Sequence, residues 1–320
     1  MAAATLKKIS EITGLSIRSV SRALRGVPGL SEEKRLKVLE TAEKLGYTPN
    51  IAARNLRLRE NHVVGMIIPG IHSKSGNYII SHKIFELELH LEREGYFPLI
   101  GMDTGKGEDM LSLLRQWAGM VKSVIILSWQ IKERPGELLG KLPMQFIFVD
   151  IKSDLGHTLS IDRTTGVKEG LAALMKRPCR KLARCGNVGT RKPGFDAAMP
   201  ELKKHRITLT YFPRNSEFED GFSLGEELIK GKFDSVFFDT DRMAFGFFKY
   251  CYLHHIRIPE DIAVIGFDDE PWDRSSCPSL STVAHPIEEV NSAIAALIKE
   301  PAAEPIHLKF DTRFIRRESV

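Results

Sequence analysis

No stretch of the 320-residue sequence approaches the ~18 consecutive apolar residues that a membrane-spanning helix requires. Lys7 and Lys8 follow the first residue so closely that the apolar segment of a signal peptide is missing as well. None of the four cysteines lies in a Cys-x-x-Cys pair or in a zinc-ligand pattern with histidine; they are Cys179, Cys185, Cys251 and Cys277. We therefore expect a cytoplasmic protein with isolated thiols and no structural metal.

Excess positive charge is confined to the first fifth of the chain. Residues 1–60 contain 12 Lys+Arg against 6 Asp+Glu, whereas the rest contains 34 against 35. A small basic head on a near-neutral body indicates a polyanionic partner for the head alone; a solvated basic surface without a partner is the alternative. With 42% hydrophobic residues, the chain is long enough for two or three domains with sizeable cores.

Two short helices are predicted at the start of the head. Thr5 is suited to cap a helix over 6–13, which Gly14 ends. Ser16 is placed to cap a second helix over 17–25. The glycine-containing turn between them would hold the second helix at a steep angle to the first.

A third helix is predicted after Ser31, with two glutamates favouring its first turn. Its inner face is expected to consist of Leu36, Leu39, Ala42 and Leu45. Such an arrangement is typical of a helix-turn-helix domain, whose second helix enters the DNA major groove.

The exposed side of the second helix carries side chains suited to DNA. We expect Ile17, Arg18 and Arg22 to face base edges, because arginine donates two hydrogen bonds to guanine and an apolar side chain contacts the thymine methyl group. The residues placed for phosphate oxygens are Ser16, Ser19, Ser21 and Arg25. A small helical bundle without a DNA role is the alternative, and the exposed arginines argue against it.

The stretches TLKKISEITGLSIRSVSRALRG and LSEEKRLKVLETAEKLGYTPNIAARNLR belong to one pattern that runs from Thr5 to about Arg57. This pattern resembles the DNA-binding headpiece of the lac repressor family. The resemblance implies that the residues just assigned to base edges occupy the base-reading positions of that family. Thr5 and Asn50 join them as candidate DNA-binding residues.

A short segment after Tyr47 is predicted to form a helix only when a partner holds it. Residues 51–57 could make about two turns, which is marginal for an isolated helix in water. In the lac repressor family, two such helices meet at the centre of the bound DNA, and a leucine wedges into the minor groove. The resemblance implies this role for Leu56, with Ala53 and Arg54 in the surrounding pattern. A disordered charged linker is the alternative away from DNA.

From Val63 onward, short β-branched runs alternate with amphipathic helical stretches. This alternation predicts parallel sheets covered by helices, in two doubly wound lobes that would hold a ligand at the carboxyl ends of their strands. The predicted fold class is therefore an all-α helix-turn-helix headpiece followed by an α/β core. The expected divisions are a headpiece over 1–48, a hinge over 49–60 and a core over 61–320.

Several stretches of the body also belong together. They are the Arg191-x-x-Gly-Phe run, the TDRMAFG run that starts at Thr240, and IPEDIAVIGFDD. These stretches resemble the effector core of the lac repressor family, which is itself similar to periplasmic sugar-binding proteins. The resemblance implies an N-lobe of about 61–160 with 286–320, and a C-lobe of about 161–285.

The resemblance further implies a set of effector-binding residues. Asp268 would accept hydrogen bonds from two ligand hydroxyls, and Arg191 would donate to the ligand as a planar fork. Asp162 matches a polar position at the lobe junction, and Trp272 matches a position where an aromatic ring stacks on a sugar. Thr240 stands where the family usually has an asparagine that contacts the ligand.

Other candidates and alternatives concern the rim of this pocket. Tyr78 and Trp129 are added because each follows a strand end, although either aromatic ring could serve packing alone. Asp268 and Arg191 could instead form a buried structural ion pair. The loop over 72–78 could cradle an anionic group near a helix N-terminus, with a merely flexible rim as the simpler interpretation.

Catalytic motifs are missing from the sequence, which contains no nucleophile elbow, P-loop, His-Glu-x-x-His or paired-carboxylate motif. The sequence therefore predicts a cofactor-free repressor that binds a pseudo-palindromic operator as a homodimer and responds allosterically to a small molecule, with a carbohydrate favoured. A sugar-active enzyme and a binding protein without a DNA function are the alternatives.

Overall fold

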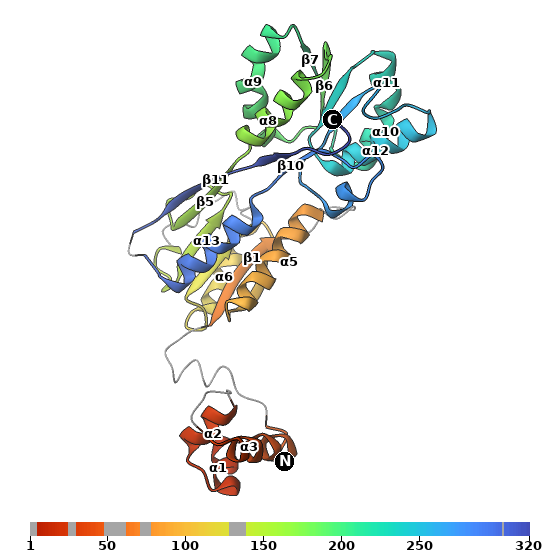
Figure 1. Ribbon diagram of the computed structural model, residues 1–320. Coiled ribbons are helices and arrows are strands. Elements are labelled where there is room, and N and C mark those ends of the chain that lie inside the picture. Colours follow the sequence, from red (N-terminus) through yellow and green to blue (C-terminus); the bar gives the residue numbers. More distant parts are fainter. Residues whose placement is uncertain (1–4, 25–29, 48–61, 71–77, 128–138, 303) are drawn as a thin grey trace. The chain divides into compact units, whose positions relative to one another are not determined.

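The computed structural model describes residues 5–24, 30–47, 62–70, 78–127, 139–302 and 304–320 (Figure 1). The chain divides into two compact units, Met1–Asn61 and His62–Val320, which we call the headpiece and the body. Among the described residues, none of the helices has the length and apolar character needed to cross a bilayer.

The headpiece contains three helices in its described part: α1 (Leu6–Thr13), α2 (Ile17–Leu24) and α3 (Glu32–Lys44). Thr5 caps α1, because its hydroxyl accepts a hydrogen bond from the Lys8 amide at 3.3 Å. Gly14, at φ 71°, ends α1 in the left-handed conformation that glycine adopts at little cost. The helices share a small core of Ile9, Val20, Ala23, Val38 and Ala42.

The buried face of α3 differs from the predicted one. Leu36 and Leu39 are 50% and 38% exposed, whereas Val38 and Ala42 are buried. Positions 38 and 42 lie one helical turn apart on the side that contacts α1 and α2, and the two leucines point away from it. The inner face of α3 is therefore set by how the three helices pack together and not by the spacing of its leucines.

The first lobe of the body is built on a six-stranded parallel sheet with the order β11-β5-β4-β3-β1-β2. Its strands are β1 (Val63–Pro69), β2 (Phe97–Asp103), β3 (Ser123–Ile126), β4 (Gln145–Val149), β5 (His157–Asp162) and β11 (His307–Asp311). Helices α5 (Tyr78–Arg93) and α13 (Ile287–Lys299) lie side by side on one face, and α6 (Gly107–Trp117) covers the other (Figure 1).

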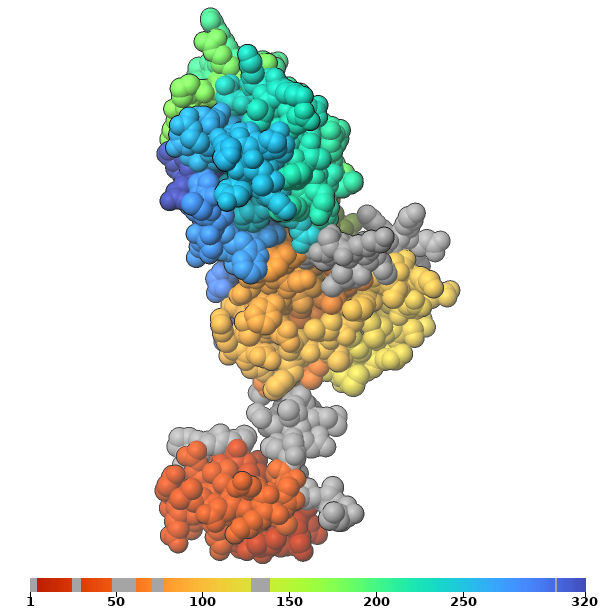
Figure 2. Space-filling view, turned by 90° about the vertical axis from the view of Figure 1, so that its right-hand side faces the viewer, coloured from red at the N-terminus to blue at the C-terminus, as the bar shows by residue number. Residues whose placement is uncertain are grey.

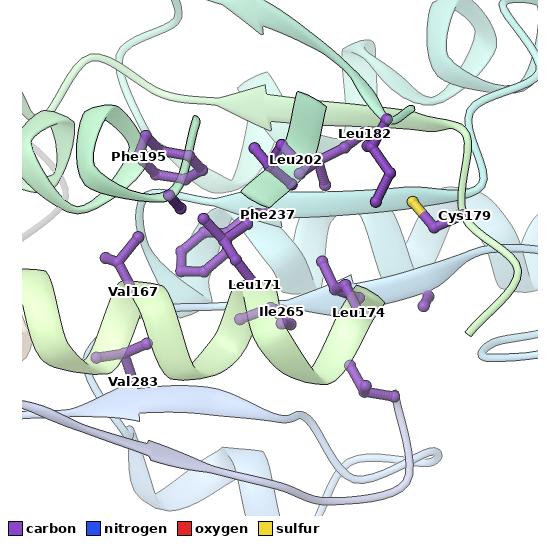
Figure 3. Packing of buried hydrophobic residues seen from close by; sticks show 14 of the residues in the cluster. Val167, Leu171, Leu174, Cys179, Leu182, Phe195, Leu202, Phe237, Ile265 and Val283 are labelled. Atoms are coloured by element: carbon purple, nitrogen blue, oxygen red, sulfur yellow. The ribbon is translucent and has the colours of Figure 1, made fainter. Parts of the chain in front are cut away.

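The second lobe is built on a four-stranded parallel sheet with the order β7-β6-β8-β9. Its strands are β6 (Lys181–Cys185), β7 (Thr208–Phe212), β8 (Ser235–Phe238) and β9 (Ala263–Ile265). Helices α8 (Thr164–Met175) and α9 (Lys192–Lys204) cover one face, where Leu171 and Phe195 pack against Phe237 (Figure 3). The other face is covered by α10 (Phe218–Ser223), α11 (Gly225–Lys230) and α12 (Asp241–Leu253). Together the two lobes confirm the predicted fold class.

The C-terminal stretch leaves the first lobe and packs on the second. After β11, strand β12 (Arg313–Ile315) pairs antiparallel with β10 (Thr282–Ala284). The Ser319 hydroxyl donates a hydrogen bond to the Val264 carbonyl at 2.6 Å, and Val320 enters the core of the second lobe. This differs from the expected assignment of the whole 286–320 segment to the N-lobe, because ladder hydrogen bonds with β10 redirect the chain after β11.

Candidate functional site

Helix α2 presents two unlike faces. Val20 and Ala23 are buried against the other helices, whereas Ile17 is 40% exposed and Arg18 is also exposed. Arg22 and Ser21 are partly exposed on the same helix. The sequence folds this way because the two apolar positions three residues apart share one side of a short helix. The outward face therefore carries most of the residues that were predicted to contact bases.

Two of the predicted DNA-binding hydroxyls are also used within the headpiece. Ser16 accepts a hydrogen bond from the Ser19 amide at 3.1 Å, and the hydroxyls of these two serines lie 2.9 Å apart. Ser16 therefore acts as the cap of α2, as Thr5 does for α1. Such caps position helix N-termini, which are sites where phosphate oxygens bind. The remaining predicted DNA-binding residues lie outside the described residues; they are Arg25, Asn50, Ala53, Arg54 and Leu56.

A cavity of about 330 Å³ lies in the body between the first turns of α5 and the segment that follows β9. In the space-filling view, the orange surface of α5 adjoins the blue surface of the chain that follows β9 (Figure 2). The residues that line the cavity are His82, Asp268, Asp269, Pro271, Arg274, His285 and Ile287. A smaller cavity of about 40 Å³ shares His285 and Ile287 with it and extends to Lys83. We call these two the effector cavity and the Lys83 cavity.

Asp268 is the buried acceptor at the centre of this region. Its Oδ1 atom lies 3.2 Å from Nη2 of Arg191 and 3.1 Å from Nε2 of His285. The Arg191 guanidinium also stacks on the Phe267 ring, 3.9 Å from the ring centroid. Asp268 has φ 125°, a backbone conformation that non-glycine residues rarely adopt and that is concentrated at functional sites.

His285 is uncharged in this setting. Burial, together with the charge of Lys83, lowers the pKa of His285 to about 3. Because a carboxylate only accepts hydrogen bonds, Nε2 of the neutral ring must donate to Asp268. Nδ1 is then an acceptor, and it is buried without a hydrogen-bond partner among the described residues.

A second ion pair, between Arg163 and Asp150, lies at strand ends of the first lobe. Both terminal nitrogens of Arg163 bind the Asp150 carboxylate, at 3.1 and 2.5 Å, and Nη1 also donates to the Ile161 carbonyl at 2.9 Å. Asp150 follows β4 and Arg163 follows β5, so the pair connects two strand ends on one edge of the sheet. Parallel strands gather their carboxyl ends at this edge, which is where ligands bind in such sheets.

Not all sequence-predicted effector residues point to the cavity. Asp162 pairs with Lys309 at 2.6 Å, and this hydrogen bond lowers the pKa of Asp162 to about 2. Thr240 caps α12: its hydroxyl accepts from the Met243 amide and donates to the Ser216 carbonyl. A threonine at this position therefore stabilises a helix start, a role that an asparagine also performs.

The aromatic candidates lie at the rim or beyond the described chain. Tyr78 begins α5 and stacks on the His82 ring, with centroids 5.7 Å apart. Trp272 is 61% exposed and sits in the 3₁₀ turn Pro271–Arg274, whose first and last residues line the effector cavity. Trp129 and the loop over 72–77 lie outside the described residues.

Sequence reasoning missed His285, His82 and Lys83. A signal for Lys83 was present, because it interrupts the buried apolar stripe of α5 that includes Ile79 and Leu87 at four-residue spacing. A lysine in such a stripe is unusual, because charged side chains are rarely buried without a partner. No local signal distinguished His285, which reaches the site through the strand pairing of β10.

A buried carboxyl pair lies beside the cavity. Asp241 accepts hydrogen bonds from the Thr282 hydroxyl at 2.6 Å and from the Glu270 amide at 3.1 Å. Burial, followed by the charge of Asp241, holds the pKa of Asp273 well above its usual range. Burial likewise raises the pKa of Asp241. These directions predict that the Asp273 carboxyl is protonated at neutral pH.

This proton makes the stability of the body depend on pH. The folded state keeps the proton on Asp273, whereas the unfolded chain releases it above the ordinary carboxyl pKa. The contribution of this proton to stability is therefore complete at pH values below the ordinary carboxyl pKa. Above that pKa, the free energy of unfolding is expected to fall by up to about 1.4 kcal/mol per pH unit. In the Asp273→Asn variant this slope is expected to flatten, as measured by denaturation between about pH 5 and pH 8. The exposed Asp196→Asn change should retain the wild-type slope, and equal slopes in all three proteins would contradict a raised pKa of Asp273.

Two parts of the chain match known family models. Residues 5–50 match the family model described as bacterial regulatory proteins, lacI family. Residues 171–320 match the model of a periplasmic binding protein-like domain. The two matches fall on the described headpiece and on the lobe that carries Asp268.

Relatives align with the chain over almost its whole length. It is 26% identical to the probable HTH-type transcriptional repressor ExuR of Bacillus subtilis, covering 99% of this chain and 98% of that protein. It is also 26% identical to the ribose operon repressor of the same species, covering 94% of each.

Solved structures share the fold. The lac repressor dimer bound to operator and the anti-inducer ONPF has a TM-score of 0.72 at 16% identity, covering 99% of each chain. A lacI-family regulator from Enterococcus faecium with bound ribose has a TM-score of 0.67 at 24% identity, covering 81% of this chain and 98% of that one.

A helix-turn-helix unit followed by a two-lobed body with a polar cavity defines a class of DNA-binding transcription regulators. The headpiece of this chain matches the lacI family model, and relatives that align over almost its whole length are named as transcriptional repressors and regulators. Both of the relatives described above are named as repressors, which does not favour the sugar-active enzyme that the sequence left as an alternative.

Proposed function

We propose that the chain is a homodimeric repressor that releases a pseudo-palindromic operator when a small hydroxylated effector binds at Asp268. The observation that carries the proposal is the pairing, in one chain, of an arginine-bearing exposed helix with a cavity centred on a buried aspartate. The first is suited to a DNA groove and the second to ligand hydroxyls. A protein of this kind works where the chromosome is, in the bacterial cytoplasm.

The proposed DNA interface is the outward face of α2, extended by the hinge. Ile17, Arg18 and Arg22 read base edges, and the serines of the same helix contact phosphates. One such helix reads only a half-site, so two copies of the chain are needed for a symmetric operator. The proposed division is a headpiece over 1–48, a hinge over 49–60 and an effector core over 61–320, with Leu56 as the hinge side chain that enters the minor groove.

The proposed effector is a sugar or sugar derivative. Asp268 offers a carboxylate to hydroxyl groups, Arg191 orients that carboxylate, and the exposed Trp272 ring offers a stacking surface. Relatives include ribose operon repressors, and neighbouring structures hold ribose, sucrose or cellobiose. Binding would change the relation of the two lobes and hence the spacing of the hinges, with a coupling of about 1–3 kcal/mol.

The direct test is operator binding by the purified protein. Fragments of the source chromosome are screened by mobility shift, and the Arg22→Ala variant is then compared with wild type on the selected operator. We expect Arg22→Ala to weaken binding by about 1–3 kcal/mol and to relax base choice at one position of each half-site. Arg35→Ala removes the same charge from α3 and should reduce affinity less, without changing base choice. Equal effects of the two variants on affinity and base choice would count against α2 as the reading helix.

A further inference from the structure

The Lys83 ammonium has no hydrogen bond or ion pair with any residue that the structure describes. It is largely enclosed, on the α5 stripe that also buries Leu87 and Leu91, and it lines the Lys83 cavity. Burial lowers the pKa of Lys83 to about 8, so the side chain is still mostly protonated at neutral pH. By exposed area Lys83 is partly buried, and a partly buried cation without a partner is available to pair with an anion.

The charges around Lys83 do not supply that anion. The carboxylates that act on it are Asp268 and Asp150, and each already has an arginine partner, Arg191 and Arg163 respectively. These four charges balance, and the neutral His285 adds none. Lys83 is therefore the uncompensated member of a cluster with three cations and two carboxylates.

Other polar atoms of this charge cluster also lack hydrogen-bond partners, and a ligand with a carboxylate and hydroxyl groups could supply them. The Nε–H groups of Arg163 and Arg191 are buried donors without acceptors, and Nδ1 of His285 is a buried acceptor without a donor, among the described residues. A carboxylate supplies acceptor oxygens for ammonium and guanidinium groups, and a hydroxyl supplies the donor. The Lys83 cavity of about 40 Å³ is lined mainly by apolar side chains, and Lys83 is the one cation among its lining residues. It shares His285 and Ile287 with the effector cavity of about 330 Å³, which would hold the rest of the molecule.

We propose that the effector is a sugar acid, whose carboxylate pairs with Lys83 while its hydroxyls bind Asp268 and His285. This inference rests on the proposed function, since it names the chemical class that occupies the same cavity. It commits to a carboxylate, and a sugar phosphate is the alternative that the experiment below distinguishes.

The experiment is a thermal-shift and calorimetric titration of the full chain with matched probes. Gluconate and galacturonate are compared with the neutral sugars glucose and galactose, and with glucose 6-phosphate. Wild-type protein is expected to be stabilised by at least one acid and not by its neutral counterpart. The Lys83→Gln change should weaken the binding of that acid by about 10- to 100-fold, which is the range for a lost charge-assisted hydrogen bond. Lys106→Gln, which removes one exposed lysine of the same lobe, should leave the affinity unchanged.

A measurement without ligand checks that Lys83 is not merely structural. Lys83→Met fills the same space without the charge and is expected to raise the melting temperature of the free protein, because it removes an unpaired buried cation. A lower melting temperature would assign Lys83 to folding and overturn the inference.

The remaining outcomes separate this inference from the proposed function. Three outcomes would each overturn the sugar-acid assignment. They are neutral sugars that bind as tightly as the acids, glucose 6-phosphate that binds in place of the acids, and no binding of any acid. Acid binding that leaves operator affinity unchanged would instead contradict the proposed function and leave the assignment of the cavity standing.

Discussion

The Asp268→Asn variant is expected to lose the response to effector and about 3–5 kcal/mol of the free energy of unfolding. Asp268 is the acceptor shared by Arg191 and His285, and the side chains of all three are buried. Asparagine preserves the shape but removes the negative charge, which leaves the Arg191 guanidinium buried without compensation. Chemical denaturation of the full chain measures the stability, and mobility shift with effector measures the response.

A surface ion pair provides the matched control for this change. Asp196 pairs with Lys192 at 2.5 Å, but both side chains are more than half exposed, so the Asp196→Asn change should cost no more than about 1 kcal/mol. DNA binding by the Asp268→Asn protein should survive at temperatures where it remains folded, because the headpiece is a separate compact unit. A normal effector response in this variant would show that Asp268 is not the ligand acceptor.

The Gly246→Ala variant is expected to destabilise the second lobe by about 3 kcal/mol or more. A Cβ atom at Gly246 would lie 1.8 Å from the Phe218 carbonyl oxygen, and one at Gly221 would lie 1.8 Å from that of Met243. Helices α10 and α12 therefore meet backbone to backbone. A carbonyl held in a helix cannot rotate aside as a side chain does, so the helices would have to separate.

The separation would also be expected to affect the effector cavity, since Asp241 is the first residue of α12 and hydrogen-bonds the Glu270 amide beside the cavity. The control is Gly189→Ala, because a Cβ there meets nothing within 4 Å. It should change the free energy of unfolding by no more than about 0.5 kcal/mol. Similar denaturation midpoints for the two variants would contradict close helix packing as the reason for these glycines.

Local signals in the sequence were sufficient for the first two headpiece helices. Thr5, Gly14 and Ser16 act within one helical turn of their own position, so their capping roles follow from sequence neighbours. The inner face of α3 was predicted incorrectly at Leu36 and Leu39. Three leucines and an alanine suggested a stripe, but contact with α1 and α2 buries Val38 instead.

The candidate cavity was only partly accessible to sequence reasoning. Asp268 and Arg191 were found through motifs, and the structure places them 3.2 Å apart although 77 positions separate them. Asp162 and Thr240 were found in the same way, yet they bind Lys309 and cap α12. A motif identifies a position in the chain but not the partner that its side chain selects.

The sequence by itself predicted a helical headpiece and a two-lobed α/β body, because helix caps and strand–helix alternation are encoded by residues close in the chain. The class of protein came from the resemblance of its motifs to the lac repressor family. Only the tertiary structure decided which charges face one another. It brings Arg191 and His285, which lie 94 positions apart, to the Asp268 carboxylate, and places Lys83 from α5 near the same group. The physical reason is that electrostatic and packing energies depend on distance in space, which chain folding sets after the local elements have formed.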